Sequence, residues 1–279
     1  MKERVIDPLE VATGAARCAG EILLRHHTHL VHEELEFKGL RDLLTRADRE
    51  AERSIVEGLE TAFPRDAILA EESGDHAGES GMRWIVDPLD GTTNFVHGLP
   101  IFAVSIARVD PSGAPEVAVV YLPRLDELLA ARRGCGATLN DRAIHVSTRS
   151  ALPESILATG FHYERHARRE SNLDHFAKFA LRVRGIRRMG SAASDLAFIA
   201  AGRLDGFWEL HLSPWDVAAG GLLVREAGGK VSDARGGEDW LHGGSIVASN
   251  GSALHESIIE TLAHPIPGWA SVQRHVGGA

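Results

Sequence analysis

The chain has 279 residues, of which 44% are hydrophobic and 25% charged, so it can bury a large core as one domain or two subdomains. Its formal net charge of −9 argues against a general nucleic-acid-binding protein, whose affinity depends on a basic surface. No apolar run approaches the roughly 20 residues that span a bilayer, and the N-terminal M-K-E-R-V-I-D-P lacks the apolar core of a signal peptide, so we expect a cytoplasmic protein without a membrane partner.

The first predicted element is a helix over residues 8–27, where apolar side chains recur at helical spacing. It leads into a histidine cluster, His26–His32, whose spacing fits no zinc site and is typical of a polar helix end. Residues 38–48 lead into a second helix that ends near Phe63. Asp48 lies near its first turn, where the helix dipole favours a carboxylate, so local sequence alone indicates a capping acid.

An apolar strand, Ala67–Ala70, is followed at once by the acidic pair Glu71 and Glu72. Paired acids usually belong to a solvated surface. This pair, however, directly follows one apolar strand and shortly precedes a second strand that ends in Asp87. We therefore regard the pair as a candidate part of a functional site.

The most informative stretch is W-I-V-D-P-L-D-G-T-T-N-F-V-H-G-L-P, residues 84–100. It begins as a buried strand, and Pro88, which has no backbone N–H, is expected to end that strand in a stiff bend. Such a bend turns Asp87 and Asp90 towards one point, with the Leu89 carbonyl between them. The next glycine marks a close backbone approach, and T-T-N suits a helix start whose free N–H groups attract an anion. Oxygen ligands beside an anion site are what magnesium-assisted phosphate chemistry requires.

Period-two apolar runs over 102–109, 117–122 and 127–131 then predict an antiparallel sheet. From about residue 151 strands alternate with helices, which predicts an α/β half. We therefore expect two halves, residues 1–150 with the acidic signature and residues 151–279, which complete the site. The candidate strands of the second half are Ile156–Thr159, Ile186–Met189, Gly206–Leu210 and Ser245–Ser249, and its candidate helices cover 165–182, 192–202, 216–227 and 252–262.

The string D-P-L-D-G-T-T-N-F, residues 87–95, resembles the signature of the inositol monophosphatase family of magnesium-dependent, lithium-sensitive phosphatases. Three further segments are similar to family motifs: D-L-L-T-R-A-D, which ends at Asp48, E-E-S, which begins at Glu71, and P-W-D-V-A-A-G-G, which contains Asp216. The resemblance covers about residues 8–262. It implies an α/β fold, a layered α-β-α-β-α sandwich of the inositol monophosphatase and fructose-bisphosphatase type, with the site between the halves.

The resemblance also implies a role for each matched residue. The residues implied to be catalytic are Asp48, Glu71 and Thr92. The implied Mg²⁺ ligands are Glu71, Asp87, the carbonyl of Leu89, Asp90 and Asp216. The implied substrate contacts are Asp90, Gly91, Thr92, Gly190, Ser191, Ala192, Glu209 and Asp216.

The implied reaction is hydrolysis of a phosphate monoester by direct in-line attack of water, without a covalent intermediate. One Mg²⁺ would lower the pKa of a water that Asp48 and Thr92 orient. A second Mg²⁺, held by Asp87, Asp90 and Asp216, would stabilise the leaving oxygen. The resemblance further implies a homodimer, inhibition by lithium and a small phosphorylated polyol as substrate.

Glu209 favours inositol 1-phosphate, because a carboxylate near the far end of the substrate repels a second phosphate and accepts hydroxyl groups of a neutral polyol. The alternatives are related phosphatases that act on fructose 1,6-bisphosphate, histidinol phosphate or a nucleotide bisphosphate. A regulatory protein that kept the fold and residual phosphatase activity is the alternative from another class. Lys38 lies in a loop that often carries a metal-modulating lysine in the family, and we assign it no role.

Overall fold

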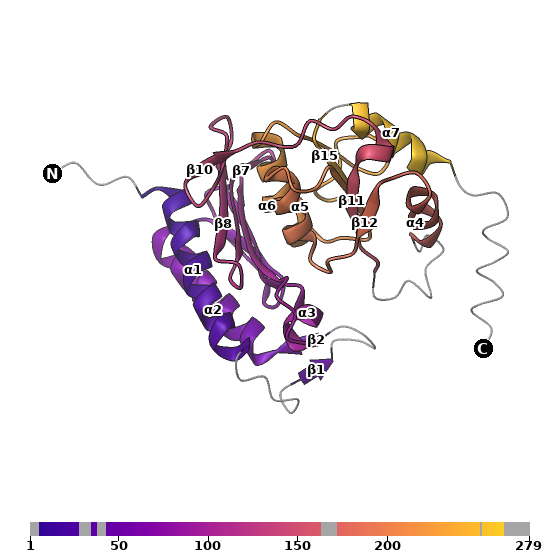
Figure 1. The fold of residues 1–279 in the computed structure, drawn as a ribbon. Coiled ribbons are helices and arrows are strands. Elements are labelled where there is room, and N and C mark those ends of the chain that lie inside the picture. The colour runs from indigo at the N-terminus through magenta and orange to yellow at the C-terminus, as the bar shows by residue number, and fades with distance from the viewer. Residues whose placement is uncertain (1–5, 28–34, 38–42, 163–171, 252, 265–279) are drawn as a thin grey trace.

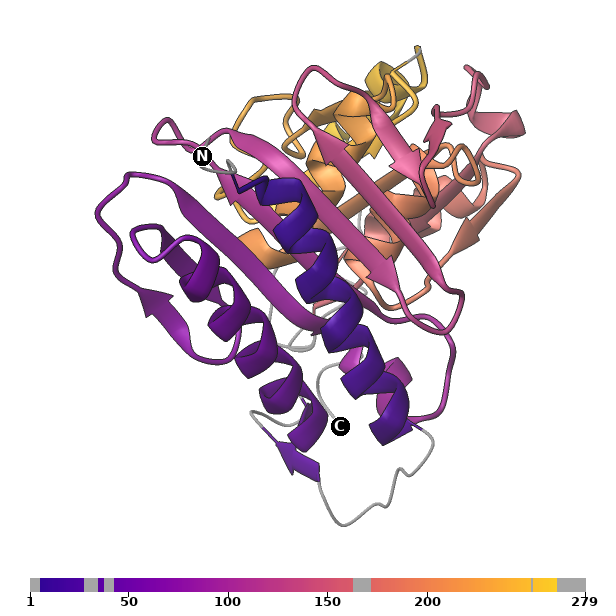
Figure 2. The same ribbon diagram turned by 90° about the vertical axis from the view of Figure 1, so that its left-hand side faces the viewer.

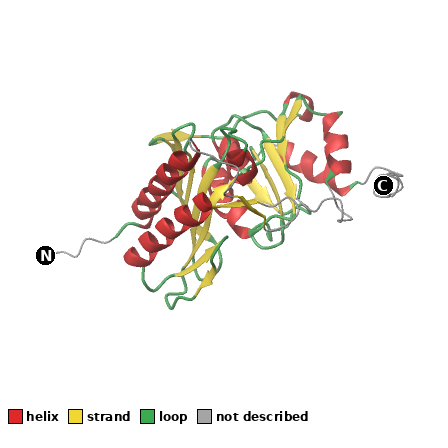
Figure 3. Cartoon of the chain, turned by 90° about the horizontal axis from the view of Figure 1, so that it is seen from below, coloured by secondary structure: helices red, strands yellow, loops and turns green. Residues whose placement is uncertain are grey.

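The computed structural model describes residues 6–27, 35–37, 43–162, 172–251 and 253–264. Most of these residues form five layers, in which helices alternate with two large β-sheets (Figures 1 and 3), and Leu35–Phe37 and Leu43–Thr45 pair as a separate two-stranded sheet. The predicted α-β-α-β-α sandwich is thereby confirmed. None of the helices in these ranges could span a bilayer.

Along the chain, the strands of the larger sheet come before those of the smaller sheet. The helices in the described part are α1 (Pro8–His27), α2 (Arg46–Ala62), α3 (Thr92–Val96), α4 (Leu173–Ala180), α5 (Ala192–Ala200), α6 (Pro214–Glu226) and α7 (Ala253–Ala263), with a short 3-10 helix over Leu152–Glu154. The strands there are β1 (Leu35–Phe37), β2 (Leu43–Thr45), β3 (Ala67–Ala70), β4 (Gly74–His76), β5 (Arg83–Asp90), β6 (Ala103–Val109), β7 (Pro115–Leu122), β8 (Glu127–Arg132), β9 (Ala137–Leu139), β10 (Arg142–Ile144), β11 (Ile156–Thr159), β12 (Gly185–Arg187), β13 (Gly206–Leu210), β14 (Lys230–Ser232) and β15 (Ser245–Ser249).

The larger sheet has the strand order β10-β9-β8-β7-β6-β5-β3-β4, and α1 and α2 lie side by side across its outer face (Figure 2). Its strands pair antiparallel except β3 and β5, which are parallel with Ala67 opposite Arg83 and Ala70 opposite Val86. Parallel pairing brings the carboxyl ends of β3 and β5 to the same edge. Glu71, directly after β3, therefore lies near the acidic end of β5.

Strand β5 does not end at Pro88, and this prediction was wrong. Asp87 pairs with Ser105 and Asp90 with Ala103, so β5 advances three residues where β6 advances two. The extra residue is a β-bulge, which bends the strand without ending it. Pairing with β3 stops at Val86, so Pro88 occupies a position where no ladder bond needs its missing N–H.

The smaller sheet has the order β12-β11-β13-β15-β14. Strands β11, β13 and β15 have the predicted bounds, whereas β12 ends before Met189 and β14 was not predicted. Helix α6 begins at Pro214, two residues earlier than expected, because Pro suits the first helical position. Residues 163–171 of the predicted helix over 165–182 lie outside the described residues.

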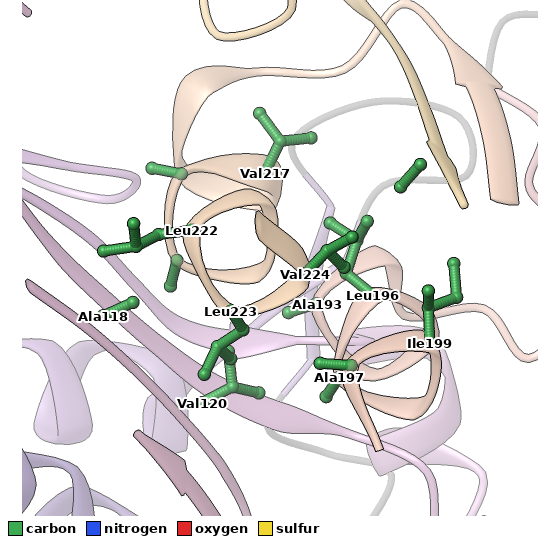
Figure 4. Packing of buried hydrophobic residues seen from close by; sticks show 14 of the residues in the cluster. Ala118, Val120, Ala193, Leu196, Ala197, Ile199, Val217, Leu222, Leu223 and Val224 are labelled. Carbon is green, nitrogen blue, oxygen red and sulfur yellow. The ribbon is translucent and has the colours of Figure 1, made fainter. Parts of the chain in front are cut away.

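Three hydrophobic cores separate the five layers. The first lies between α1, α2 and the outer face of the large sheet, and the third lies between the small sheet and α4 and α7. The second surrounds α5 and α6 between the two sheets, where Leu223 of α6 lies beside Val120 of β7 and Val224 of α6 lies beside Leu196 of α5 (Figure 4). Because helices cover both faces of the large sheet, its central strands are buried almost continuously instead of alternating.

The close approach of α5 and α6 depends on Gly220. A Cβ added there would lie 2.5 Å from the Cβ of Leu196. We expect Gly220→Ala to lower the melting temperature, because overpacking costs about 1–3 kcal/mol and outweighs the helix propensity of alanine. Gly58→Ala is the matched control: it lies on an exposed part of α2 with nothing within 4 Å of the added atom, so it should raise the melting temperature. Thermal unfolding that shows an increase in both variants would contradict this packing.

Candidate active site

Three aspartates from the two halves of the chain converge at the inner edge of the large sheet. Asp87 and Asp90 come from β5 and Asp216 from the first turn of α6, and carboxylate oxygens of the three lie within 4.8 Å of one another. Glu71 joins them, since its backbone N–H donates to the Val86 carbonyl at 3.1 Å, next to Asp87. The structure therefore brings together the four acids that the sequence predicted as metal ligands.

Burial raises the pKa of Asp87 well above its usual range, and repulsion from Glu71, Asp90 and Asp216 adds to that shift. Burial also raises the pKa of Asp216, with Asp90 as the next cause. Crowded carboxylates of this kind are destabilised unless a cation lies among them. Their oxygen donors suit a hard divalent cation such as Mg²⁺, so the site fits the metal that the sequence implied.

Backbone and hydroxyl donors hold these like charges in place. Burial raises the pKa of Asp90 to about 6, although Ser191 Oγ and the Ala193 N–H donate to its Oδ2 at 2.7 and 2.6 Å and oppose the shift. The N–H of Ser213 donates to Asp216 Oδ2 at 2.6 Å at the beginning of α6. The amino-terminal ends of α5 and α6 thus both supply donors to acids of the cluster.

Thr92, the first residue of α3, lies between a carboxylate and a carbonyl. Its Oγ1 is 3.4 Å from Oδ1 of Asp48 and 3.1 Å from the Leu89 oxygen. Asp48 is buried in the first turn of α2, as predicted. The hydroxyl has one proton, so it donates to one of these oxygens at a time and keeps lone pairs for a water.

Gly91 precedes α3 with a φ of 95°, and the close backbone approach expected there is present. A Cβ at this position would lie 3.1 Å from the carbonyl oxygen of Ile101 and 3.3 Å from that of Gly190. Gly190 itself has a φ of 81°. Both predicted glycines therefore occupy backbone conformations that side chains disfavour.

A cavity of about 240 Å³ adjoins the acidic cluster. The predicted site residues that line it are Glu71, Asp90, Gly190, Ser191, Ala192, Glu209 and Asp216. The other predicted residues, which stand outside that lining, are Asp48, Asp87, Leu89, Gly91 and Thr92. The cavity is thus formed mainly by the segments before α5 and α6 and by the ends of β5, β11 and β13.

Nine residues of this lining were not predicted as site residues, and three of them act on Asp90 or Glu209. Arg188 faces Asp90 and Glu209, whose raised pKa values it opposes. Asp195 lies within the first turn of α5. Gly160 follows β11, and a Cβ there would lie 2.1 Å from both carboxylate oxygens of Glu209. Asp195 was visible as an acid in an otherwise apolar helix, whereas the contact of Gly160 depends on strand pairing and had no local signal.

Of the His26–His32 cluster, the structure describes the first two members. His26 Nε2 lies 2.9 Å from Glu50 Oε2, and the His27 ring packs 5.3 and 5.2 Å from the rings of Phe95 and Phe102. These contacts fit the predicted helix end. The remaining residues of the cluster and Lys38 lie outside the described residues.

Glu52, one turn after Asp48 in α2, is another missed residue. It is 4% exposed, and its two carboxylate oxygens accept the backbone N–H groups of Glu72 and Ser73, each at 2.8 Å. It thereby fixes the turn that carries Glu71. A larger hollow of about 420 Å³ adjoins Glu52 on the outer surface, and no predicted site residue lines it.

We expect Glu52→Gln to weaken Mg²⁺ binding and to lower the melting temperature. An amide offers one acceptor oxygen, so one of the two N–H groups loses its partner, at a cost of about 1–3 kcal/mol. Glu57→Gln changes an exposed residue of the same helix and hollow and should change neither quantity. Calorimetric titration with Mg²⁺ and thermal unfolding measure both effects, and wild-type values for Glu52→Gln would show that the turn does not depend on this carboxylate.

The metal-free protein should lose stability as the pH rises from 6.5 to 8.5. Burial, with Asp90 as a further cause, raises the pKa of Glu209 to about 8. A raised carboxyl pKa stabilises the fold below the unfolded value, and this contribution is lost as the pH rises through about 8. His255, whose pKa burial lowers to about 4, acts in the opposite direction only below about pH 6.5. Melting temperatures in chelator should therefore fall across this window and fall less in Glu209→Gln; a rise in the wild type would contradict the expected burial.

Comparison with known proteins identifies the chain. The model of the inositol monophosphatase family matches residues 7–265. An inositol-1-monophosphatase of Mesorhizobium japonicum is 44% identical over 92% of this chain and 97% of its own length. The Nus factor SuhB of Escherichia coli strain K12 is 46% identical over 87% of this chain and 91% of its own length.

Solved structures agree with these relatives. The extragenic suppressor protein suhB from Bartonella henselae superposes with a TM-score of 0.85 at 43% identity and covers 92% of this chain and 98% of its own. The inositol monophosphatase from Anabaena superposes with a TM-score of 0.84 at 40% identity and covers 94% and 97%. The chain therefore belongs to the inositol monophosphatase family, whose members are metal-dependent phosphatases of small phosphorylated substrates.

Proposed function

We propose that the chain hydrolyses small phosphate monoesters with Mg²⁺ and that inositol 1-phosphate is its substrate. The observation that carries this proposal is the convergence of four acids from both halves, Glu71, Asp87, Asp90 and Asp216, next to a cavity that also contains Glu209. The similarity to an inositol-1-monophosphatase over nearly the whole chain supports the same substrate.

The four acids and the carbonyl of Leu89 would hold Mg²⁺. When bound there, the metal supplies the positive charge that acidifies a water and stabilises the leaving oxygen. Backbone N–H groups at the amino-terminal ends of α5 and α6 donate to Asp90 and Asp216 and keep both carboxylates oriented. Their oxygens are therefore already in position for a metal, and little side-chain freedom is lost when it binds.

The attacking water is oriented by Asp48 and Thr92. With the Thr92 hydroxyl donating to Asp48 at 3.4 Å, its lone pairs accept a proton of the water and fix the direction of a water lone pair. The backbone N–H groups of Gly91 and Thr92, at the beginning of α3, bind the phosphate oxygens. No nucleophilic side chain takes part, so water attacks phosphorus directly.

The alcohol part of the substrate lies against Gly190, Ser191, Ala192 and Glu209. Ser191 already donates its hydroxyl proton to Asp90, so a contact to the substrate comes from its backbone or its lone pairs. Glu209, with a pKa raised to about 8 by burial, both accepts and donates hydrogen bonds near neutral pH. Such a group suits the hydroxyls of a polyol better than a second phosphate.

We further propose inhibition by lithium, assembly as a homodimer, a cytoplasmic location and a division into halves near residue 150. A regulatory role beside catalysis is the second candidate, and the observation in its favour is the 46% identity to a protein named Nus factor SuhB.

Phosphate release from a substrate panel tests the proposal. We expect turnover only with Mg²⁺, with the highest kcat/KM for inositol 1-phosphate among a panel that includes fructose 1,6-bisphosphate, histidinol phosphate and adenosine 3′,5′-bisphosphate. Full activity in excess chelator would refute the metal mechanism. A folded protein without turnover of any panel member in Mg²⁺ would favour the regulatory candidate.

Two threonine variants serve as matched controls in the same assay. Thr92→Ala should lower kcat by about 10²-fold without loss of Mg²⁺ binding, because orientation of the nucleophile acts mainly on the transition state. Thr93→Ala removes the same atoms one residue later in α3 and should leave kcat at the wild-type value. Equal kcat values in the two variants would remove Thr92 from the mechanism.

A further inference from the structure

The cavity contains a buried carboxylate that the proposed mechanism does not use. Asp195 is 1% exposed and lines the cavity from the first turn of α5. Its Oδ1 is buried and accepts no hydrogen bond from the residues that the structure describes. Buried carboxylate oxygens are rarely left without a donor, because the lost hydration is costly. An oxygen of this kind beside a substrate cavity indicates a donor that arrives with a ligand.

Asp195 is held in a fixed relation to the reaction centre. The carbonyl of Ser191 accepts the Asp195 backbone N–H at 3.0 Å, and the hydroxyl of Ser191 donates to Asp90 at 2.7 Å. Ser194 completes the turn, with its Oγ 2.6 Å from that of Ser191. One helical turn therefore positions both Asp90 and Asp195, so a ligand on Asp195 lies at a set distance from the acidic cluster.

The electrostatic surroundings of Asp195 indicate a neutral ligand rather than a cation. Glu209 and Asp90 lie near enough to raise its pKa after burial, and Arg188 opposes them. Arg188 likewise opposes the raised pKa of Glu209. The Arg188 guanidinium already offsets the negative charge of Asp195 and Glu209, so a cationic substrate is not required. Hydroxyl groups of a neutral substrate would donate the hydrogen bond that Asp195 Oδ1 does not accept from any described residue.

We propose that Asp195 and Glu209 form a two-acid subsite that binds two hydroxyl groups of the substrate alcohol. The preferred substrates are then phosphate monoesters of polyols with at least two free hydroxyls, and esters of alcohols without hydroxyls bind poorly. This inference rests on the proposed function and adds Asp195 as a residue that determines specificity.

The test compares two substrates that differ only in hydroxyl groups, inositol 1-phosphate and cyclohexyl phosphate, in wild type and Asp195→Ala. Loss of one hydrogen bond to a substrate hydroxyl is worth about a five- to tenfold change in affinity. We therefore expect Asp195→Ala to raise KM for inositol 1-phosphate about five- to tenfold and to leave kcat/KM for cyclohexyl phosphate unchanged. Asp174→Ala, in the first turn of α4 and outside the cavity, should change neither substrate.

Asp195→Asn provides a second variant of the same size, so the test does not depend on the folding of the alanine variant. It should show a smaller increase in KM, again confined to inositol 1-phosphate. Equal losses for both substrates, or no loss for either, would overturn the inference. Failure of the wild type to hydrolyse either ester in Mg²⁺ would instead refute the proposed function, and the subsite with it.

Discussion

Mutual repulsion among the buried carboxylates is the constraint on which the rest of this structure depends. Asp87, Asp90 and Asp216 place oxygens within 4.8 Å of one another, and each accepts a backbone N–H: from Leu89 at 2.9 Å, from Ala193 at 2.6 Å and from Ser213 at 2.6 Å. These donors belong to the bulge of β5 and to the amino-terminal ends of α5 and α6, where the helix dipole also favours negative charge. The repulsion among these carboxylates destabilises the metal-free fold. The backbone N–H donors nevertheless keep the carboxylates close together, in positions that suit a cation.

The layer between the two sheets explains why those donors are rigid. All nine residues of α5 are buried, and α6 is buried from Val217 to Val224. A helix that is apolar on every side has no solvated face, so its polar residues are informative. In α5 they are Ser194 and Asp195, both in the first turn: Ser194 Oγ contacts Ser191 Oγ, and Asp195 lines the cavity. Close packing on all sides fixes α5 and α6. The N–H donors at their amino-terminal ends are therefore fixed as well, and they hold Asp90 and Asp216 in place.

The sequence predicted those parts of the fold that short-range patterns determine. Strands β3, β11, β13 and β15 have the expected bounds because each is a short apolar run between polar or glycine residues, and the signature from Asp87 to Phe95 indicated the chemistry. The bulge at Pro88 was not predictable, because it depends on the register between β5 and β6. Arg188 and Gly160 were missed for a related reason, since their contacts with Glu209 are created by the pairing of β11 with β13 and by the turn before α5.

The buried acids of this chain fall into two kinds, according to whether hydrogen-bond donors of the protein satisfy their carboxylate oxygens. Glu52 and Asp205 are both buried, and both are satisfied by the protein: Glu52 by two backbone N–H groups, and Asp205 by Arg149 and the Ile156 N–H at 3.1 and 2.7 Å. Asp87 and Asp216 differ, since burial and neighbouring charges raise their pKa values despite the bonds they accept, and one oxygen of Asp195 has no donor among the residues that the structure describes. Acids of the first kind connect segments of the fold. Acids of the second kind would be stabilised by a cation or by the hydroxyl group of a ligand, which is the physical basis for the metal site and the hydroxyl subsite that we propose.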